Sequence, residues 1–289
     1  MTAVKNTTEL SLGESVSSSY LFSSDFYQIK NWSFDFKREG NLKQGYNECF
    51  CLVFIKKGNL AIDLAPHSYN MHIGHVVLEK AHYEYTLRPT IGECSIFNFT
   101  SSFYEQLIQD YSLSKSFFFG NSNLLSVVLS ASPEIDYLHH QIMKKVEEAG
   151  KLELDSLVMK LVDELLKSIT DKTLDVELPA SIRKNHISTI ERAKLYLQDH
   201  FAENISLQDL AAHCHISPFH FGRLFKKFTN YSPHQYLLLV RLKHAEMLLR
   251  NTPCPILDIC FSSGFNSMEH FATMFKQHYQ VSPSQYRKE

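Results

Sequence analysis

Short apolar runs dominate the first hundred residues and predict β-structure from about residue 20 to residue 99. The longest run, residues 49–55, has no polar interruption and predicts a buried strand. Residues 56–59 contain two lysines, a glycine and an asparagine, so they predict a turn, and the alternating run at 60–64 completes a hairpin. Further runs lie at 76–78, 83–87 and 94–99. Many short strands with little helix predict a small sandwich or barrel.

From residue 101 onward the apolar positions follow the period of α-helices. A serine at 101 or 102 ahead of Glu105 forms a capping box and predicts a helix to about residue 110. Two longer amphipathic helices follow, with apolar faces at Ile135, Leu138, Ile142 and Val146, and at Leu154, Leu157, Val158, Leu161, Leu165 and Ile169. Residues 171–186 mix charges with turn formers and predict an interdomain linker, and a helix over 188–200 opens the next domain.

A unit of about fifty residues occurs twice in the last third of the chain. Phe-Lys at 225–226 recurs at 275–276, and Ser-Pro-x-Gln-Tyr at 232–236 recurs at 282–286, both with an offset of 50. Each copy predicts a short helix, a tight turn and a capped second helix, at about 205–228 and 256–278. This is the layout of a helix-turn-helix DNA-binding motif. One long helix over 233–250 joins the two copies.

The distribution of charge supports two domains with different partners. The chain has 289 residues, and its net charge of −2 is divided between residues 183–289 (13 Lys and Arg against 8 Asp and Glu, +5) and residues 1–182 (16 against 23, −7). The basic half carries the duplicated helices, which suits DNA binding. Residues 1–19 are polar and predict a flexible N-terminus without a secretory signal. No apolar run approaches the ~20 residues that span a bilayer, and six cysteines lack metal-binding spacing, so we expect a cytoplasmic protein.

The duplicated segment resembles the C-terminal DNA-binding domain of the AraC/XylS family of bacterial transcription regulators. The resemblance is carried by residues 206–212, 217–227, 241–245, 264–265 and 275–287. It implies an AraC-type DNA-binding domain at 187–289 and, ahead of it at 20–170, a cupin-like β-barrel with a helical hairpin that serves as sensor and dimerisation domain. The predicted fold is therefore α+β, with an all-α C-terminal domain. Asn230 and Gln280 stand where the family usually has glycine, and we expect backbone strain at Gln280.

The candidate DNA contacts lie on the second helix of each copy. Phe221, Leu224, Phe225 and Phe228 in one copy, and Phe271, Met274 and Phe275 in the other, have helical spacing and predict core. Candidate contacts in the first copy are Ser217, Phe219, His220, Gly222, Arg223 and Lys227. Those in the second are Ser267, Met268, Glu269, Thr273 and Lys276. We expect Arg223 to donate hydrogen bonds to a guanine and Phe219 to pack on a thymine methyl group. Lys227 and Lys276 are expected to contact phosphates.

Neither metal nor catalytic chemistry is predicted. Four histidines and a glutamate lie close in the β-region, at His67, His72, His75, His82 and Glu79. They lack the His-x-His pair of metal-binding cupins, so we expect no metal and no cofactor. The chain shows no nucleophile elbow, P-loop or dinucleotide-binding signature and no plausible catalytic set, so it is not expected to be an enzyme.

The sequence therefore predicts a DNA-binding transcription regulator whose partner is double-stranded promoter operator DNA. Its barrel is expected to bind a small effector and to form a homodimer through the leucine stripe 154, 157, 161 and 165, and RNA polymerase stays open as a further partner. Two alternatives remain: a cupin-type metalloenzyme with an accessory DNA-binding domain, and a regulator whose N-terminal domain only dimerises. The sequence identifies neither the effector nor the operator, and does not separate activation from repression.

Overall fold

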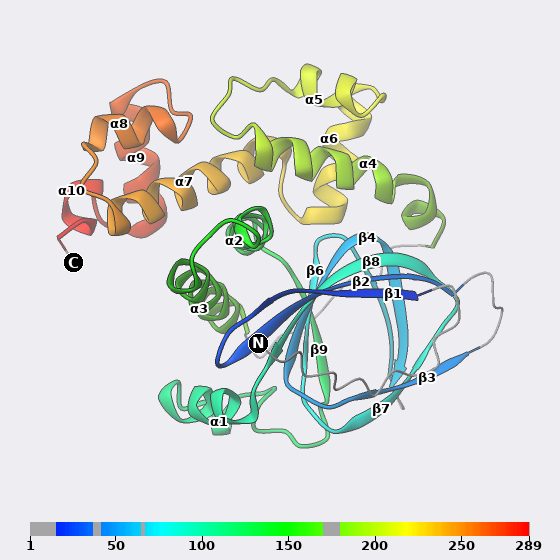
Figure 1. Cartoon of the computed structure of the whole chain (residues 1–289). Helices are drawn as coiled ribbons and strands as arrows, with labels where there is room; N and C mark the ends of the chain where they lie inside the picture. Colours follow the sequence, from blue (N-terminus) through cyan, green and yellow to red (C-terminus); the bar gives the residue numbers. More distant parts are fainter. Residues whose placement is uncertain (1–15, 37–41, 65–66, 170–179, 289) are drawn as a thin grey trace. The chain divides into compact units, whose positions relative to one another are not determined.

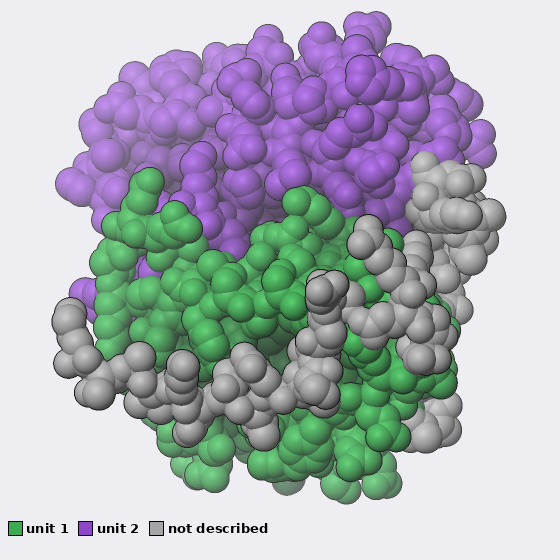
Figure 2. Space-filling view, turned by 45° about the vertical axis from the view of Figure 1, so that its right-hand side comes forward, with its two compact units in different colours: residues 1–130, 146–151, 167–179 green, residues 131–145, 152–166, 180–289 purple. Residues whose placement is uncertain are grey.

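The computed structural model describes residues 16–36, 42–64, 67–169 and 180–288. The chain forms two compact units (Figure 2). Unit 1 comprises residues 1–130, 146–151 and 167–179, and unit 2 comprises residues 131–145, 152–166 and 180–289. The sheet belongs to unit 1, and the helix-turn-helix helices belong to unit 2. The predicted class, a mixed α+β fold with a sheet-rich N-terminal region and a helical C-terminal region, is confirmed.

Antiparallel strands build unit 1. They are β1 (Val16–Ser23), β2 (Tyr27–Asp35), β3 (Lys43–Asn47), β4 (Cys51–Leu64), β5 (His67–His72), β6 (His75–Glu79), β7 (Tyr83–Leu87), β8 (Ile91–Phe99) and β9 (Ser126–Ser130). The helix α1 (Ser101–Asp110) and the short 3₁₀ helix η1 (Leu113–Lys115) lie between β8 and β9 in the chain. The cap of α1 is Thr100, which accepts from the backbone N–H of Phe103, so the helix is present but the predicted capping box of Ser101 or Ser102 with Glu105 is wrong.

The strand β4 is the centre of the sheet. The paired strands follow the order β1-β2-β8-β4-β6-β9, while β5 and β7 also pair with β4, and β3 pairs with β7. The path of pairings does not close on itself among the described strands, so a closed barrel is not confirmed. Apolar side chains on these strands, among them Phe34, Val53, Leu60 and Cys94, form one buried cluster.

The hairpin predicted at residues 49–64 is wrong, because β4 runs through the expected turn. The pairing of β4 with β8 shifts register between Ile55 and Lys57, which marks a β-bulge. Gly58 has φ of 68°, and a Cβ there would lie 2.1 Å from the carbonyl oxygen of Ile91. The lysines and glycine that resemble a turn therefore form a bend in a continuous strand, and Lys56 and Lys57 pair with Glu93 on β8 at 2.6 and 3.1 Å.

The remaining helices lie wholly or mainly in unit 2. They are α2 (Pro133–Lys145), α3 (Lys151–Ser168), α4 (Ala180–Asp199), α5 (Leu207–His213), α6 (Pro218–Thr229), α7 (Pro233–Asn251), α8 (Ile256–Ser262), α9 (Met268–Tyr279) and α10 (Pro283–Tyr286). Figure 1 shows α7 as the single helix that joins the α5–α6 pair to the α8–α9 pair. No helix in the described part of the chain is long and apolar enough to cross a membrane.

Several predicted boundaries differ from the elements observed. The strand β1 begins at Val16, so residues 16–19 are strand, and residues 1–15 of the expected flexible terminus lie outside the described residues. The helix α4 begins at Ala180 inside the expected linker, of which residues 171–179 also lie outside that description. Residues 131–145 and 152–166, which the sequence assigns to the sensor domain, belong to unit 2 with the helix-turn-helix motifs.

The leucine stripe of α3 is core rather than surface. Leu154, Leu157, Leu161 and Leu165 are each at most 4% exposed within a single chain. These four side chains therefore do not offer the surface that the homodimer prediction assigned to them. Dimerisation itself stays a prediction.

His244 is a half-buried histidine at the contact of α2 with α7. The hydroxyl of Tyr137 lies 2.6 Å from its Nδ1 atom. Burial, and to a smaller extent the charge of Lys145, lower the pKa of His244 from 6.5 to about 4. The folded chain therefore holds a neutral imidazole at pH values where the unfolded chain binds a proton.

We predict that acid destabilises unit 2 through His244. Because the pKa is lower in the folded state, this stabilisation is complete above pH 6.5 and is lost as the pH falls toward 4. In that window the free energy of unfolding should fall by up to about 1.4 kcal/mol per pH unit from this group. Urea unfolding followed by helical circular dichroism should give a shallower pH dependence for His244→Asn than for the parent chain. Equal slopes for the two proteins would contradict the prediction.

Candidate nucleic-acid interface

The first helix-turn-helix motif consists of α5, a tight turn and α6, its recognition helix. Ser206 forms a capping box with Asp209 at the start of α5. Ser217 caps α6 by accepting a hydrogen bond of 3.4 Å from the backbone N–H of His220. In the turn, His215 has φ of 58°, a left-handed conformation. The predicted turn and cap of this copy are therefore confirmed.

The second motif, α8 and its recognition helix α9, repeats this geometry with a longer turn. In the first turn the backbone N–H of Ile216 donates to Ala211, and in the second that of Phe265 donates to Cys260, an offset of 49. The helix caps, Ser217 and Ser267, are 50 residues apart. The additional residue, Asn266, thus follows the second turn and precedes the cap of α9.

Gly264 in the second turn is required by a close approach as well as by its φ of 82°. A Cβ at this position would lie 2.8 Å from the guanidinium of Arg241 on α7 and from the carbonyl oxygen of Phe201. That guanidinium donates to the carbonyls of Phe201 and Glu203, both at 2.7 Å. The turn of the second motif is therefore fixed against α7 and the segment that follows α4.

A cluster of three aromatic rings supports each recognition helix. In the first copy, the ring centres of Phe221 and Phe225 are 5.6 Å apart. The rings of Phe225 and Tyr236 meet edge to face, with their centres 5.4 Å apart and an interplanar angle of 88°. The second copy repeats both distances: the ring centres of Phe271 and Phe275 are 5.6 Å apart, and those of Phe275 and Tyr286 are 5.4 Å apart with an interplanar angle of 81°. The predicted core positions are buried, except that Met274 is half-buried.

The outward face of α6 is aromatic near its start and basic toward its end. Phe219 is 75% exposed, and the guanidinium of Arg223 lies 5.5 Å from the centre of its ring, a cation–π contact. Lys226 and Lys227 are exposed on the last turns, and α6 contains no acidic residue. A Cβ added to Gly222 on this helix would meet no atom within 4 Å. The six candidates of the first copy thus lie on one capped helix.

His186 extends this face and was missed by the sequence analysis. An open groove is lined by His186 of α4 together with Phe219, His220 and the cations of α6. The rings of His186 and His220 lie 5.4 Å apart. The sequence had placed residue 186 in a linker, so the only signal would have been an earlier start for α4.

The outward face of α9 is less basic than that of α6. Ser267 caps the helix by accepting from the N–H of His270 at 3.2 Å. Glu269, Thr273 and Lys276 are exposed, whereas Met268 is half-buried and packs on the core of the second copy. Four of the five candidates in this copy are therefore accessible, with one carboxylate and one lysine among them.

The residues that follow the recognition helices adopt the conformation expected for glycine. Asn230 has φ of 64° and Gln280 has φ of 66°, both left-handed. Asparagine tolerates this region better than glutamine, so the larger strain is expected at Gln280. The side-chain amide of Gln280 donates to the carbonyl of Gln277 at 2.9 Å.

The histidines of the β-region lie outside unit 2. His72 is buried, its Nδ1 is 2.8 Å from the carbonyl oxygen of Ile73, and its ring lies 3.9 Å from that of His75. His82 lies in a left-handed turn beside the hydroxyl of Tyr46. Among the described side chains, which do not include that of His67, no three His, Cys, Asp or Glu groups come together to hold a metal.

Two capped recognition helices at the ends of one connecting helix define a protein with tandem helix-turn-helix DNA-binding motifs. Residues 210–289 match the family model of a helix-turn-helix domain. The regulatory protein PocR of Salmonella typhimurium is 30% identical over 162 residues, which cover 54% of this chain and 51% of that protein. The HTH-type transcriptional activator RhaS of Klebsiella pneumoniae is 34% identical over 104 residues, which cover 36% of this chain and 37% of that protein.

A solved structure, the C-terminal domain of AraT, a response regulator from Geobacillus stearothermophilus, is 33% identical, covers 35% of this chain and 84% of its own, and has a TM-score of 0.34. From the family model and the regulators, the C-terminal part of this chain is an AraC-type helix-turn-helix domain, and the predicted resemblance is confirmed. The named relatives are regulators rather than enzymes. The chain spans about half the length of the Salmonella protein and just over a third of the Klebsiella protein.

We predict opposite effects of Gly222→Ala on stability and on DNA binding. The added methyl group meets open space, so the helix should gain about 1 kcal/mol in the free energy of unfolding. If this face of α6 packs closely on DNA, the same methyl group should lower affinity several-fold. Denaturant unfolding and fluorescence anisotropy with operator DNA measure the two effects. A more stable variant with unchanged affinity would show that Gly222 does not approach DNA.

Proposed function

We propose that the whole chain is a sequence-specific transcription regulator that binds promoter operator DNA through both helix-turn-helix motifs. In this proposal the N-terminal unit is a cupin-like sensor that binds a small effector and takes part in a homodimer. The protein acts in the cytoplasm, with RNA polymerase as a further partner. The observation that carries the proposal is the pair of capped recognition helices at the two ends of α7.

The length of α7 supports binding to two grooves. Its 19 residues extend over ~28 Å at 1.5 Å per residue. One turn of B-DNA advances ~34 Å, so recognition helices attached at both ends can reach successive major grooves on one face of the duplex. The same reasoning makes a single chain sufficient to contact two segments of DNA.

The chemistry of α6 supports sequence recognition by the first motif. Arg223 can present two N–H donors to a guanine, and the ring beneath it, Phe219, restricts where the guanidinium lies. Lys226 and Lys227 follow on the last turns, where a recognition helix leaves the groove and meets the phosphate backbone. On α9, Glu269 can accept from a cytosine amino group, while Lys276 is the expected phosphate contact.

The interior of unit 1 supports the assignment of an effector. Glu79 on β6 is 7% exposed and accepts a hydrogen bond of 3.3 Å from the thiol of Cys51. Burial raises the pKa of Glu79, although the contacts with Cys51 and Tyr83 oppose the shift. A few polar groups among apolar side chains are typical of small-molecule sites.

Two measurements separate this proposal from its alternatives. Metal analysis of the purified protein tests the cupin-type metalloenzyme, because an enzyme of that kind must bind its metal. A thermal-shift screen of small metabolites tests the regulator whose N-terminal unit only dimerises, since a ligand that binds the native state raises the melting temperature. A selective shift would support the sensor.

The binding of two grooves gives a direct test. One chain should protect two groove segments about a helical turn apart on selected operator DNA, because α6 and α9 are attached at opposite ends of α7. Hydroxyl-radical footprinting of operator DNA bound to the full chain measures the protected segments. Protection of a single segment would contradict the proposal and leave α8 and α9 with a structural role.

The proposal also assigns different contacts to Arg223 and Lys227. Arg223→Ala should cost about 1–3 kcal/mol on the selected site and much less on unrelated DNA, because it removes a base contact. Lys227→Ala should weaken all sequences about equally and lower the salt slope by roughly one counterion. Arg223→Lys keeps the charge but loses the planar pair of donors, so it serves as the matched control. Binding titrations at several salt concentrations, with single-base-substituted sites, distinguish these patterns. An even loss across all sites for Arg223→Ala would make it a phosphate contact.

A further inference from the structure

We propose that α2 is a positioning element for DNA recognition: through Asp136 and Glu134 it holds α6 and α9 at one fixed spacing. The proposal rests on the proposed function, in which both helices bind the same operator. α2 lies in unit 2 with both helix-turn-helix motifs, although it precedes the segment that matches the family model. Its two acidic side chains contact different halves of that segment.

Asp136 connects α2 to the first motif. Its carboxylate lies 2.6 Å from the ammonium group of Lys194 on α4 and accepts a hydrogen bond of 3.0 Å from the hydroxyl of Tyr236 on α7. Gln198 donates to the same hydroxyl at 3.2 Å. Tyr236 is the ring on which Phe225 of α6 packs. One carboxylate therefore fixes the ring that supports the first recognition helix.

The contact of Asp136 is buried, which makes it specific. Asp136 is 7% exposed and Lys194 is 3% exposed. Burial raises the pKa of Asp136, and the adjacent Lys194 opposes that shift. A buried ion pair adds little net stability, but leaving either charge without its partner is costly. The arrangement therefore tolerates one geometry of α2 relative to α4 and α7 and disfavours others.

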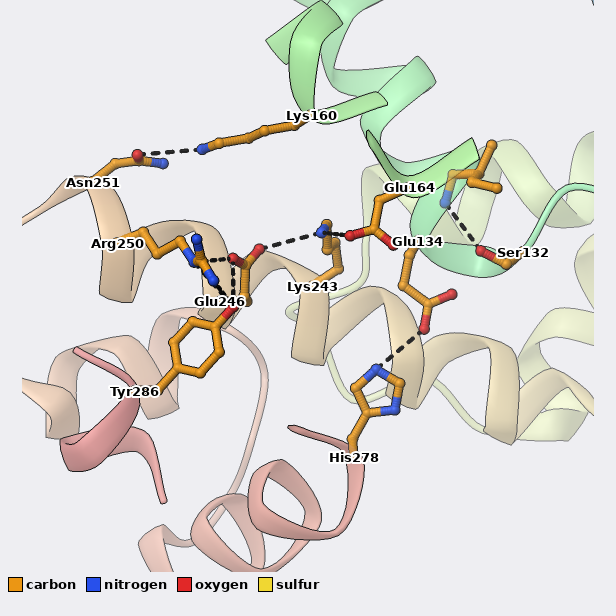
Figure 3. Close-up of polar contacts among 11 residues, drawn as sticks. Ser132, Glu134, Lys160, Glu164, Lys243, Glu246, Arg250, Asn251, His278 and Tyr286 are labelled. Carbon is orange, nitrogen blue, oxygen red and sulfur yellow. Dashed lines mark hydrogen bonds and ion pairs between the residues drawn. The ribbon is translucent and has the colours of Figure 1, made fainter. Parts of the chain in front are cut away.

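Glu134 connects α2 to the second motif. Its carboxylate lies 3.4 Å from Nε2 of His278, near the end of the second recognition helix, α9 (Figure 3). Ser132 accepts from the backbone N–H of Ile135, which fixes the turn that carries Glu134. Because Glu134 and Asp136 are two residues apart, the same turn of α2 contacts both motifs.

A second chain of charges leads from α3 to α9. Lys243 on α7 lies 2.9 Å from Glu164 of α3 and 3.3 Å from Glu246 (Figure 3). Glu246 in turn accepts from Tyr286 of α10 at 3.0 Å and pairs with Arg250 at 2.8 Å. Tyr286 is the ring that supports Phe275 of α9. The hairpin of α2 and α3 therefore braces the second recognition helix both directly and through α7 and α10.

These contacts constrain the distance between the two recognition helices. Apart from α2 and α3, the described chain joins the two motifs through α7, whose ends carry them, and through residues 201–203, which lie against Gly264 and Arg241. A brace at both ends limits bending and rotation of one motif relative to the other. The expected consequence is a strong dependence of affinity on the number of base pairs between the two operator segments.

The test measures how tightly the full chain binds operators that differ in the spacing between their two segments. The penalty is the ratio of dissociation constants between the selected site and the same site with one base pair inserted between its two segments. For Glu134→Ala, which breaks the partly exposed contact with His278, we expect this penalty to fall about fivefold or more. Affinity for DNA that carries only the segment bound by α6 should stay unchanged. Circular dichroism verifies that the variant is folded.

Two further variants show whether the effect belongs to this contact. Glu153→Ala removes an exposed glutamate from the same helical hairpin, where it pairs with Lys145, and should leave the penalty at the parent value. The exchanged pair Glu134→His with His278→Glu should restore the parent penalty. An unchanged penalty in folded Glu134→Ala, or an equal loss of affinity on every DNA, would overturn the proposal. A parent chain that ignores spacing would instead overturn the two-groove function on which the proposal rests.

Discussion

The position of each recognition helix depends on a tyrosine that supports it from the side. Phe225 of α6 packs on the ring of Tyr236, and Phe275 of α9 packs on that of Tyr286, with the same ring separation of 5.4 Å. Tyr236 is fully buried, so its hydroxyl group requires a partner, because an unpaired buried hydroxyl is costly. Apolar packing of the helices is thereby coupled to polar contacts deeper in unit 2.

Those polar contacts come from helices outside the helix-turn-helix motifs. The hydroxyl of Tyr236 donates to Asp136 of α2, and the hydroxyl of Tyr286 donates to Glu246, whose charge is balanced by Lys243 and Arg250. A buried carboxylate requires a cation. Asp136 pairs with Lys194 of α4, and Lys243, which pairs with Glu246 within α7, also pairs with Glu164 of α3. In this way the hairpin of α2 and α3 becomes part of the unit that carries the DNA-binding motifs.

Local signals in the sequence were sufficient for the duplicated motifs. The caps at Ser217 and Ser267 depend on contacts a few residues apart, and the left-handed backbone at Gly264 is a local property, so composition and spacing predict them. The bend in β4 was not predictable, because Lys56 to Asn59 resemble a turn until the register with β8 is known. The spacing of short apolar runs could indicate strands, but not whether their pairings close into a barrel.

The docking of α2 was hidden for a different reason. Glu134, Asp136 and Lys243 are charged residues that a periodic pattern assigns to a solvated helix face, and only their distant partners allow them to be buried. His186 was not among the predicted DNA contacts, because no local signal indicated that α4 begins inside the expected linker. Contacts within each motif are therefore predictable from the sequence, whereas contacts between helices far apart in the chain are not.

The two recognition helices differ in charge, and because of this difference positioning by α2 matters more for DNA binding by α9 than by α6. The helix α6 carries Arg223, Lys226 and Lys227 without an acid, whereas α9 carries Glu269 and Lys276. Attraction to phosphates is therefore stronger for α6. A weakly attracted helix gains most from being held in position beforehand, because binding then costs less conformational freedom. Glu134 acts on α9, through His278. Under the proposed function, α6 supplies most of the affinity, and α9, held by α2, sets the register in which the operator is bound.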